Sequence, residues 1–412
     1  MFVEYDTEIY ADESILNIPL VATILPLAWL TGSDLYVETL DKSFKESMEK
    51  LQQIFQTMLQ LPKYGTKIIV DKIVENQANP VDPDRRTGLL FSGGIDSSYS
   101  LITNIDTKPR LIMHWGLDGP PYPIYRDYWE MVQSTYTKYA TQNDLTYNLT
   151  KTNVLEILNS RKIEHRFSKE LYYGSLWVRL QESLVILCLT APLSIKRFNR
   201  LIIAASMYKG SPANTDINRP HSAKPEIDEN ITWADIKVKH DGFIPRYQKT
   251  SKIAEYLKKN DLHLRVCLAR PSNQNTPEKM NCNNCSKCYR TIMQLTQAGY
   301  DPNKTNFIVD ENTFTKIREY YTTHGLDVYG NNSKSIIPEK IEEDIHGSRA
   351  FFEWLKNYTP QKGRNLWPYR DIYYSLPWSL AKVLNKVYKM AGINIHNAIP
   401  VLPDNIVKRL KT

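Results

Sequence analysis

The chain has 412 residues, of which 42% are hydrophobic, so it can bury a sizeable core in one large domain or in two to three modest ones. Its 52 Lys and Arg exceed its 45 Asp and Glu by 7, a mild surplus that is not concentrated in one block. This balance fits a protein that handles anionic substrates and gives little support to nucleic acid as a partner.

The first 85 residues are expected to form an accessory α/β domain. Residues 2–5 and 34–37 are predicted to be a strand pair, and residues 43–61 carry apolar side chains at helical spacing. A linker rich in Asn, Pro and Asp, around residues 79–86, ends this part of the chain.

Two segments, residues 14–29 and 183–195, are apolar enough to be candidates for targeting or membrane segments. The first contains Pro19 and Pro26 and follows acidic residues, whereas a signal peptide begins with basic ones. The second is too short to cross a membrane and is expected to be a buried helix. We therefore expect a soluble, cytoplasmic protein that does not bind membranes.

Between residues 86 and 300, predicted strands and helices alternate along the chain. This alternation predicts an α/β fold with a doubly wound parallel sheet, in which ligands bind beyond the carboxyl ends of the strands. Strands are expected at 88–92, 109–115, 146–150, 200–206, 237–240 and 264–268, and helices at 95–104, 125–142, 174–193 and 250–259.

Residues 301–412 form an aromatic-rich extension that is expected to be helical. Helices are predicted at residues 314–321, 347–357 and 378–391, and turns with Pro and Gly lie at their ends. Two roles fit this extension, a cap over an active site or an assembly surface such as that of a homodimer.

A glycine turn joins the strand at 88–92 to the helix at 95–104. Two glycines permit a tight turn and the close approach of a ligand. The backbone amides at the start of the helix, with two serine hydroxyls, predict a cradle for a phosphate-sized anion. The Walker loop is excluded because it needs a Lys followed by Ser or Thr. The expected nucleotide-binding residues are Ser92, Gly93, Gly94, Ile95, Asp96, Ser97 and Ser98.

Four of the five cysteines lie close together in the sequence: Cys267, Cys282, Cys285 and Cys288. In a cytoplasmic chain, this clustering favours a metal over disulfides. Four thiolates suit structural zinc, with an iron–sulfur cluster as the competing interpretation. Cys188 lies in an apolar helical stretch and is expected to belong to the core.

The loop Ser-Gly-Gly-x-Asp-Ser resembles that of the N-type ATP pyrophosphatases, which split ATP between its alpha and beta phosphates. Together with Cys…Cys-x-x-Cys-x-x-Cys, it resembles 7-cyano-7-deazaguanine synthase, over about residues 86–295. The resemblance implies ATP and Mg²⁺ at the loop and Zn²⁺ at the four cysteines. It further implies that a carboxylate is adenylated and then attacked by ammonia.

Further site residues come partly from this resemblance. The synthase family carries a lysine at the start of a helix after its penultimate strand, and Lys252 matches best, with Lys249 and Arg246 as close rivals. His114 and Trp115 follow the second strand, which touches adenosine in the superfamily. Asp96 is expected either to position Mg²⁺ or to cap the helix. The expected catalytic residues are Asp96, Ser97, Lys252, Lys249 and Arg246.

The resemblance weakens where an acceptor substrate would bind. The Pro-Gly-Arg-Asn stretch of the family is missing, and residues 173–183 stand in its place. His221, Asp228, His240 and Asp241 lie in a loop-rich stretch that is a candidate for substrate recognition. Relatives in anti-phage or glycan operons imply a deazaguanine-type substrate, a small molecule or a protein amine as the acceptor. The alternatives are an iron–sulfur enzyme that thiolates RNA and a nucleotide-binding scaffold without turnover.

Overall fold

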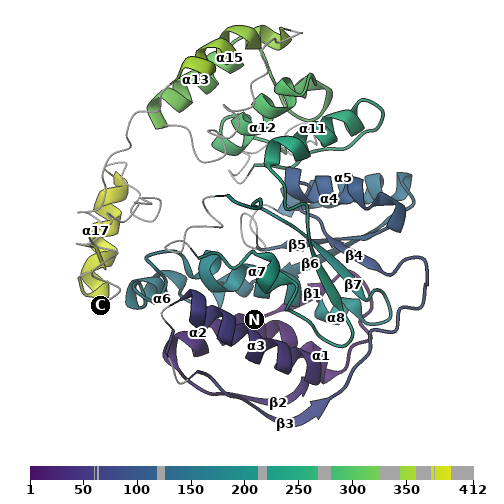
Figure 1. Cartoon of the computed structure of the whole chain (residues 1–412), viewed down its shortest axis with the longest axis vertical. Coiled ribbons are helices and arrows are strands. Elements are labelled where there is room, and N and C mark those ends of the chain that lie inside the picture. The colour runs from purple at the N-terminus through teal and green to yellow at the C-terminus, as the bar shows by residue number, and fades with distance from the viewer. Residues whose placement is uncertain are drawn as a thin grey trace.

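The computed structural model describes residues 1–59, 61–62, 65–117, 126–211, 220–267, 280–324, 344–358, 373–374 and 376–390. A six-stranded sheet lies at its centre, in the order β1-β6-β5-β4-β7-β8 (Figure 1). All neighbouring strands are parallel except β1, which is antiparallel to β6. The strands are β1 (Val3–Tyr5), β4 (Thr87–Leu90), β5 (Arg110–Trp115), β6 (Thr146–Thr152), β7 (Arg200–Ala204) and β8 (Lys237–Asp241).

Helices cover both faces of this sheet, as expected for a doubly wound fold (Figure 1). Leu89 and Phe91 pack into one core and Leu90 into another, because successive side chains of a strand point to opposite faces. The first core includes α4 (Ile95–Thr103), α5 (Arg126–Gln142), α11 (Arg246–Leu257) and α12 (Ser286–Gln297), and the second α2 (Ile18–Thr31), α3 (Lys42–Met58) and α7 (Glu182–Cys188).

Most predicted elements between residues 86 and 300 are confirmed, with bounds that shift by a few residues. The predicted strand at 264–268 is wrong for its described part, since residues 264–267 are extended but join no sheet. Shorter helical elements are α1 (Glu13–Leu16), α6 (Ser160–Arg166), α8 (Ala191–Ser194) and α10 (Pro225–Asp228), with 3₁₀ turns at Ile105–Thr107, Val154–Glu156, Pro302–Lys304 and Ile345–Gly347.

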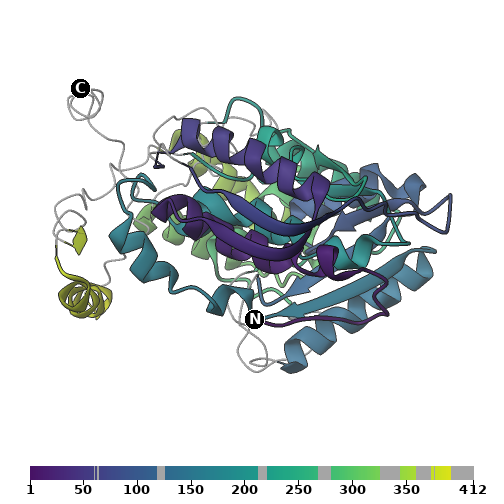
Figure 2. The same ribbon diagram turned by 90° about the horizontal axis from the view of Figure 1, so that it is seen from below.

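The N-terminal strands pair differently from the prediction. The predicted pair of residues 2–5 with 34–37 is wrong, because β1 pairs with β6. β2 (Leu35–Asp41) instead pairs in parallel with β3 (Ile68–Val74), a strand that the sequence reading missed. Figure 2 shows this two-stranded sheet lying across α2 and α3. Whether residues 1–85 form a domain of their own stays a prediction.

The apolar segment near the N-terminus forms the buried helix α2. Pro19 is accommodated in its first turn and Pro26 lies inside it, while most of its side chains are buried. A helix that is apolar on nearly all sides belongs in a protein core. This explains the composition of residues 14–29 without a targeting role.

The expected helices after residue 300 are present where the structure describes them. α13 (Thr313–His324) and α15 (Ser348–Asn357) contribute Phe314 and Phe352 to the same core as α12. α17 (Trp378–Met390) lies beside α6, where the rings of His165 and Trp378 are 5.5 Å apart (Figure 1). Residue 391, the end of the last predicted helix, lies outside the described residues.

Candidate functional site

The glycine turn follows β4, at the point where the chain order of the sheet reverses. β5 lies on one side of β4 and β7 on the other, so the loop sits at the switch point of the sheet. Gly93 has φ of +75°, a conformation that favours glycine. A Cβ atom built on Gly93 would lie 2.5 Å from Cζ of Tyr136, so the loop is packed directly against α5.

The start of α4 provides the donors of an anion cradle. Gly94 is the residue that caps the helix, and the amides of the first helical turn have no acceptor within the helix. The hydroxyls of Ser92 and Ser97 lie 3.2 Å apart beside this turn. Together these groups can hold a phosphate-sized anion. Ser98 lies deeper, because its side chain is fully buried and its amide donates to the Gly94 carbonyl.

Asp96 is held by two cations from α11. Its Oδ1 accepts from Lys249 Nζ at 2.8 Å and its Oδ2 accepts from Arg246 Nη1 at 2.8 Å. Burial raises the pKa of Asp96, but the charges of Arg246 and Lys249 outweigh burial and hold this pKa below its usual range. The carboxylate therefore orders two positive groups beside the loop, and the residue at the cap position is Gly94.

Of the three basic candidates on α11, the structure brings two to the loop. Lys249 is almost fully buried and also donates to the Ala205 carbonyl. Lys252, which the resemblance favoured, instead pairs with Glu255 at 3.0 Å and its side chain is 56% exposed. The assignment of Lys252 to the site is therefore not supported by its position.

His114 and Trp115 take different positions at the end of β5. His114 lines a cavity beside the loop and its Nε2 lies 3.1 Å from the Ile186 carbonyl. Burial lowers the pKa of His114 to about 4, so the ring is neutral at neutral pH. Trp115 is buried and stacks on Trp129, with ring centroids 5.5 Å apart. The resemblance placed Trp115 beside adenosine, and its burial instead assigns it to the core.

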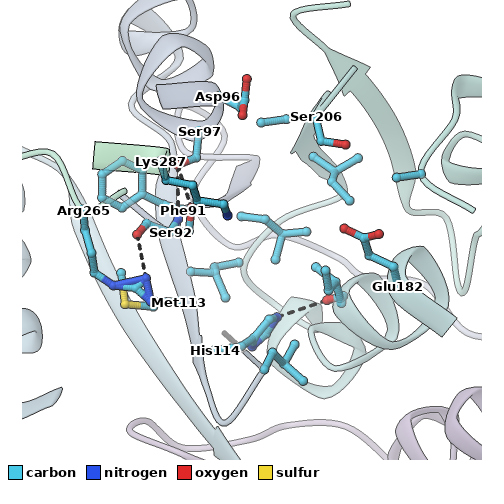
Figure 3. A pocket seen from close by; sticks show the side chains of 17 residues that line it. Phe91, Ser92, Asp96, Ser97, Met113, His114, Glu182, Ser206, Arg265 and Lys287 are labelled. Atoms are coloured by element: carbon cyan, nitrogen blue, oxygen red, sulfur yellow. Dashed lines mark hydrogen bonds between the residues drawn. The ribbon is translucent and has the colours of Figure 1, made fainter. Parts of the chain in front are cut away.

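The cavity has a volume of about 240 Å³ and lies beyond the carboxyl ends of β4, β5 and β7 (Figure 3). A smaller hollow of about 100 Å³ adjoins this cavity. Gly94, Ile95 and Arg246 line the smaller hollow only. Four residues line both spaces: Ser92, Asp96, Arg265 and Lys287. Among the described residues, the cations that line these spaces are Arg246, Arg265 and Lys287, and the carboxylates are Asp96 and Glu182.

Arg265 and Lys287 were missed in the sequence. Arg265 belongs to the extended segment at 264–267, and its amide donates to the Gly93 carbonyl at 2.7 Å. Lys287 lies in the first turn of α12, between Cys285 and Cys288. The one feature of the sequence that could have indicated a role for them is that both lie within two residues of a cysteine of the cluster.

The four clustered cysteines converge in space. All four sulfur atoms lie within 4.8 Å of one another, and three of the Sγ–Sγ distances are 3.5, 3.8 and 3.9 Å. Tetrahedral zinc with Zn–S bonds of about 2.3 Å sets sulfur atoms about 3.8 Å apart. The cluster can therefore bind a metal such as zinc. Cys188 is buried elsewhere in the core, as expected.

The wall opposite the loop carries Glu182 (Figure 3). This residue follows a π-helical turn, Trp177–Gln181, and turns of this kind frequently occur at functional sites. Glu182 Oε2 lies 3.6 Å from Nε2 of His221, whose pKa is lowered to about 4 by burial.

The other polar candidates do not join this wall. Nδ1 of His240 and Oδ2 of Asp228 lie 2.6 Å apart in a buried pair, and burial raises the pKa of Asp228. Asp241 pairs with Lys239 at 2.6 Å. Neither Asp228, His240 nor Asp241 lines the cavity, so the expected cluster of four substrate-reading residues is reduced to His221 beside Glu182.

Comparison with protein-family models, with curated proteins and with solved structures gave no match for this chain. Within the described ranges, the helices are all too short or too polar to cross a membrane. The site must therefore be interpreted from its own chemistry.

Proposed function

We propose that this protein is an ATP-dependent adenylating enzyme that cleaves ATP to AMP and pyrophosphate. The observation that carries the proposal is the position of the glycine turn, at the switch point of the sheet and beside two adjoining spaces that together are lined by more cations than carboxylates. Polyphosphates need such a site, because backbone amides and cations together offset their charge.

The proposed reaction joins an acceptor carboxylate to the alpha phosphate. A carboxylate oxygen attacks this phosphorus, the bond to the bridging oxygen breaks, and pyrophosphate leaves with the electron pair. Negative charge grows on the leaving group, so donors that are already in position lower the barrier. The amides at the start of α4, the Ser92 and Ser97 hydroxyls and Arg265 are the groups of this chain assigned to that task.

Two metals belong to the proposal. Mg²⁺ generally arrives with nucleotide phosphates and takes one or two protein carboxylates. Asp96 fits as one of them, since a carboxylate has about four lone-pair sites and two are occupied by Lys249 and Arg246. Zn²⁺ is assigned to the cysteine cluster in a structural role, because four thiolates leave no open position for substrate.

The acceptor is proposed to bind on the wall that holds Glu182 and His114, where His221 contacts Glu182 but does not itself line the cavity. In the neutral His114 ring, Nε2–H donates to the Ile186 carbonyl, which leaves Nδ1 to accept a hydrogen bond from a polar heterocycle such as a deazaguanine. The activated carbonyl would then be attacked by ammonia or an amine. Either attack forms an amide bond and releases AMP.

Exchange of labelled pyrophosphate into ATP tests this proposal, with carboxy-deazaguanine, amino acids and sugar acids screened as acceptors. Replacing Asp96 by Asn removes the charge that is assigned to Mg²⁺ and that holds Arg246 and Lys249, and it should lower exchange at least about 100-fold, the size of an electrostatic contribution beside the reacting phosphate. Asp144→Asn is the matched control, because Asp144 also binds one Arg and one Lys but lies at the surface. Exchange that survives in Asp96→Asn would contradict the site.

Metal analysis and the same exchange measurement also test two other functions. An iron–sulfur enzyme would contain iron, and its four thiolates would be divided between two iron atoms in a [2Fe–2S] cluster or among four in a [4Fe–4S] cluster. Sulfur ligands on different iron atoms would therefore lie farther apart than the 3.5 to 3.9 Å found here. A scaffold without turnover would bind ATP and give no exchange with any acceptor.

A further inference from the structure

The cysteine cluster and the glycine turn are joined by a short, fully hydrogen-bonded path. The Arg265 amide donates to the Gly93 carbonyl at 2.7 Å, and Cys267 follows two residues later. The Arg265 guanidinium lies over the Trp129 ring, with 4.9 Å from Cζ to the ring centroid. A displacement of Cys267 would therefore be passed to the loop through a buried segment of only three residues, 265–267.

A single asparagine connects the two halves of the cluster. Oδ1 of Asn281 accepts from the amides of Val266 and Cys267 at 3.0 and 3.3 Å, and its Nδ2 donates to the Leu264 carbonyl at 2.7 Å. Asn281 directly precedes Cys282 and is 3% exposed. The segment that supports the loop and the segment that carries three cysteines thus form one unit.

Lys287 projects from this unit toward the loop. It lies between Cys285, which caps α12, and Cys288, so metal binding at both cysteines would fix its backbone from both sides. Its side chain lines the larger cavity with Ser92 and Ser97, and the smaller hollow with Ser92 and Gly94 (Figure 3). A lysine whose backbone is fixed in this way loses less conformational freedom when it binds an anion.

We propose that Lys287 binds the pyrophosphate portion of ATP and that the metal-bound cysteine cluster holds it in place. The inference rests on the proposed function and adds a role for the metal that a purely structural site would not have. Metal occupancy would then control affinity for the nucleotide, although the metal itself does not contact the substrate. The position of Lys287 carries the argument, since it lies between two cysteines of the cluster and lines both hollows.

Binding measurements can test the role of Lys287 without turnover. Affinities for pyrophosphate, AMP and a non-hydrolysable ATP analogue are measured by calorimetry in Mg²⁺ for Lys287→Met, Lys287→Arg and the wild-type protein. Lys287→Met should weaken pyrophosphate and the ATP analogue about 10- to 100-fold, the size of one hydrogen bond to a charged group. AMP affinity should be unchanged, and Lys287→Arg should recover most of the loss because it keeps the charge.

Lys316→Met is the matched control. Lys316 lines a separate hollow near Cys282 together with Asp310, and residues 92–98 of the loop are not among the residues that line it. Its replacement should leave all three affinities unchanged. Equal affinities in Lys287→Met and the wild type would overturn the inference, and so would a loss of AMP affinity. A wild-type protein that binds neither ATP analogue nor pyrophosphate would instead overturn the proposed function.

The coupling to the metal needs a second comparison. Metal is removed with a chelator from the wild type and from Lys287→Met, and circular dichroism checks that both stay folded. Metal removal should weaken pyrophosphate binding by the wild type about as much as the substitution does, by about 10- to 100-fold. Metal removal from Lys287→Met should then add less than about twofold, because the two changes remove the same contact. Fully additive losses would show that the cluster does not act through Lys287.

Discussion

Replacing Gly93 by Ala gives the sharpest test of the loop geometry. The residue has φ of +75°, and a Cβ atom there would lie 2.5 Å from Cζ and 3.0 Å from Cε2 of Tyr136, with the hydroxyl oxygen closer still. Tyr136 cannot easily withdraw. It is fully buried, its hydroxyl donates to the His263 carbonyl at 3.0 Å, and its ring meets Phe91 edge-on at 4.9 Å.

Two costs combine in Gly93→Ala. The left-handed backbone costs a residue with a side chain about 1–2 kcal/mol. Overpacking against a fixed ring costs about 1–3 kcal/mol more. We therefore expect the free energy of unfolding to fall by about 2–5 kcal/mol, as measured by denaturant titration, which makes this one of the most damaging methyl additions in the chain.

Gly299→Ala separates the two costs. Gly299 has φ of +67°, yet no atom lies within 4 Å of where its Cβ would be. This variant should lose only the backbone part, about 1–2 kcal/mol. The reasoning is refuted if Gly93→Ala is within about 0.5 kcal/mol of Gly299→Ala, the size of an ordinary surface effect.

Three further predictions use the ion pairs, the cysteines and the aromatic core. Asp96→Asn should lower the free energy of unfolding by about 2 kcal/mol. This value is small for a paired buried charge, because the Asp96 side chain is 22% exposed. Asp144→Asn should have no measurable effect on the free energy of unfolding. Because the folded-state pKa of Asp96 is lowered, its contribution is present above about pH 4 and is lost below, so wild type and Asp96→Asn should converge in stability in acid titrations. Cys285→Ser should lower the metal content, measured by mass spectrometry, below one zinc per chain. Cys188→Ala should leave the zinc content unchanged. Iron in the wild-type protein would contradict the zinc assignment. Trp115→Phe should destabilise the fold and leave the affinity for ATP unchanged, and a selective loss of ATP affinity would restore Trp115 to the site.

The parts of the site that are local in sequence were predictable. The glycine turn lies within six residues, and its strand, turn and helix follow from neighbouring residues alone. Three of the cysteines lie within seven residues, so a common ligand could be anticipated. Cys267 joined them by composition, because few other cysteines were available to the chain.

The choice among the three basic residues of α11 required the position of the helix. α11 begins at Arg246, four residues before the predicted start. A helix rises about 1.5 Å per residue and turns about 100°, so Lys252 stands roughly 9 Å along the axis from Arg246 and on a different side. Arg246 and Lys249, one turn apart, can reach one carboxylate together, and Lys252 cannot.

The contacts made by Arg265, Lys287 and β1 could not be predicted. Each depends on a partner far away in the sequence, such as Gly93 for Arg265 and residues 150–152 for β1. A three-residue strand carries too little pattern to identify its partner. Pairing of this kind is fixed only when the whole sheet is assembled.

The place of β1 at the edge of the sheet has a consequence for biosynthesis. Val3 and Tyr5 leave the ribosome well before their partners Thr152 and Thr150, which follow about 150 residues later. Until then β1 has no strand to join, and after that β6 would present an open edge to other nascent chains if β1 failed to bind. β1 is therefore made before β6 but joins the sheet only after it, and its pairing covers an edge at which newly made copies could otherwise join.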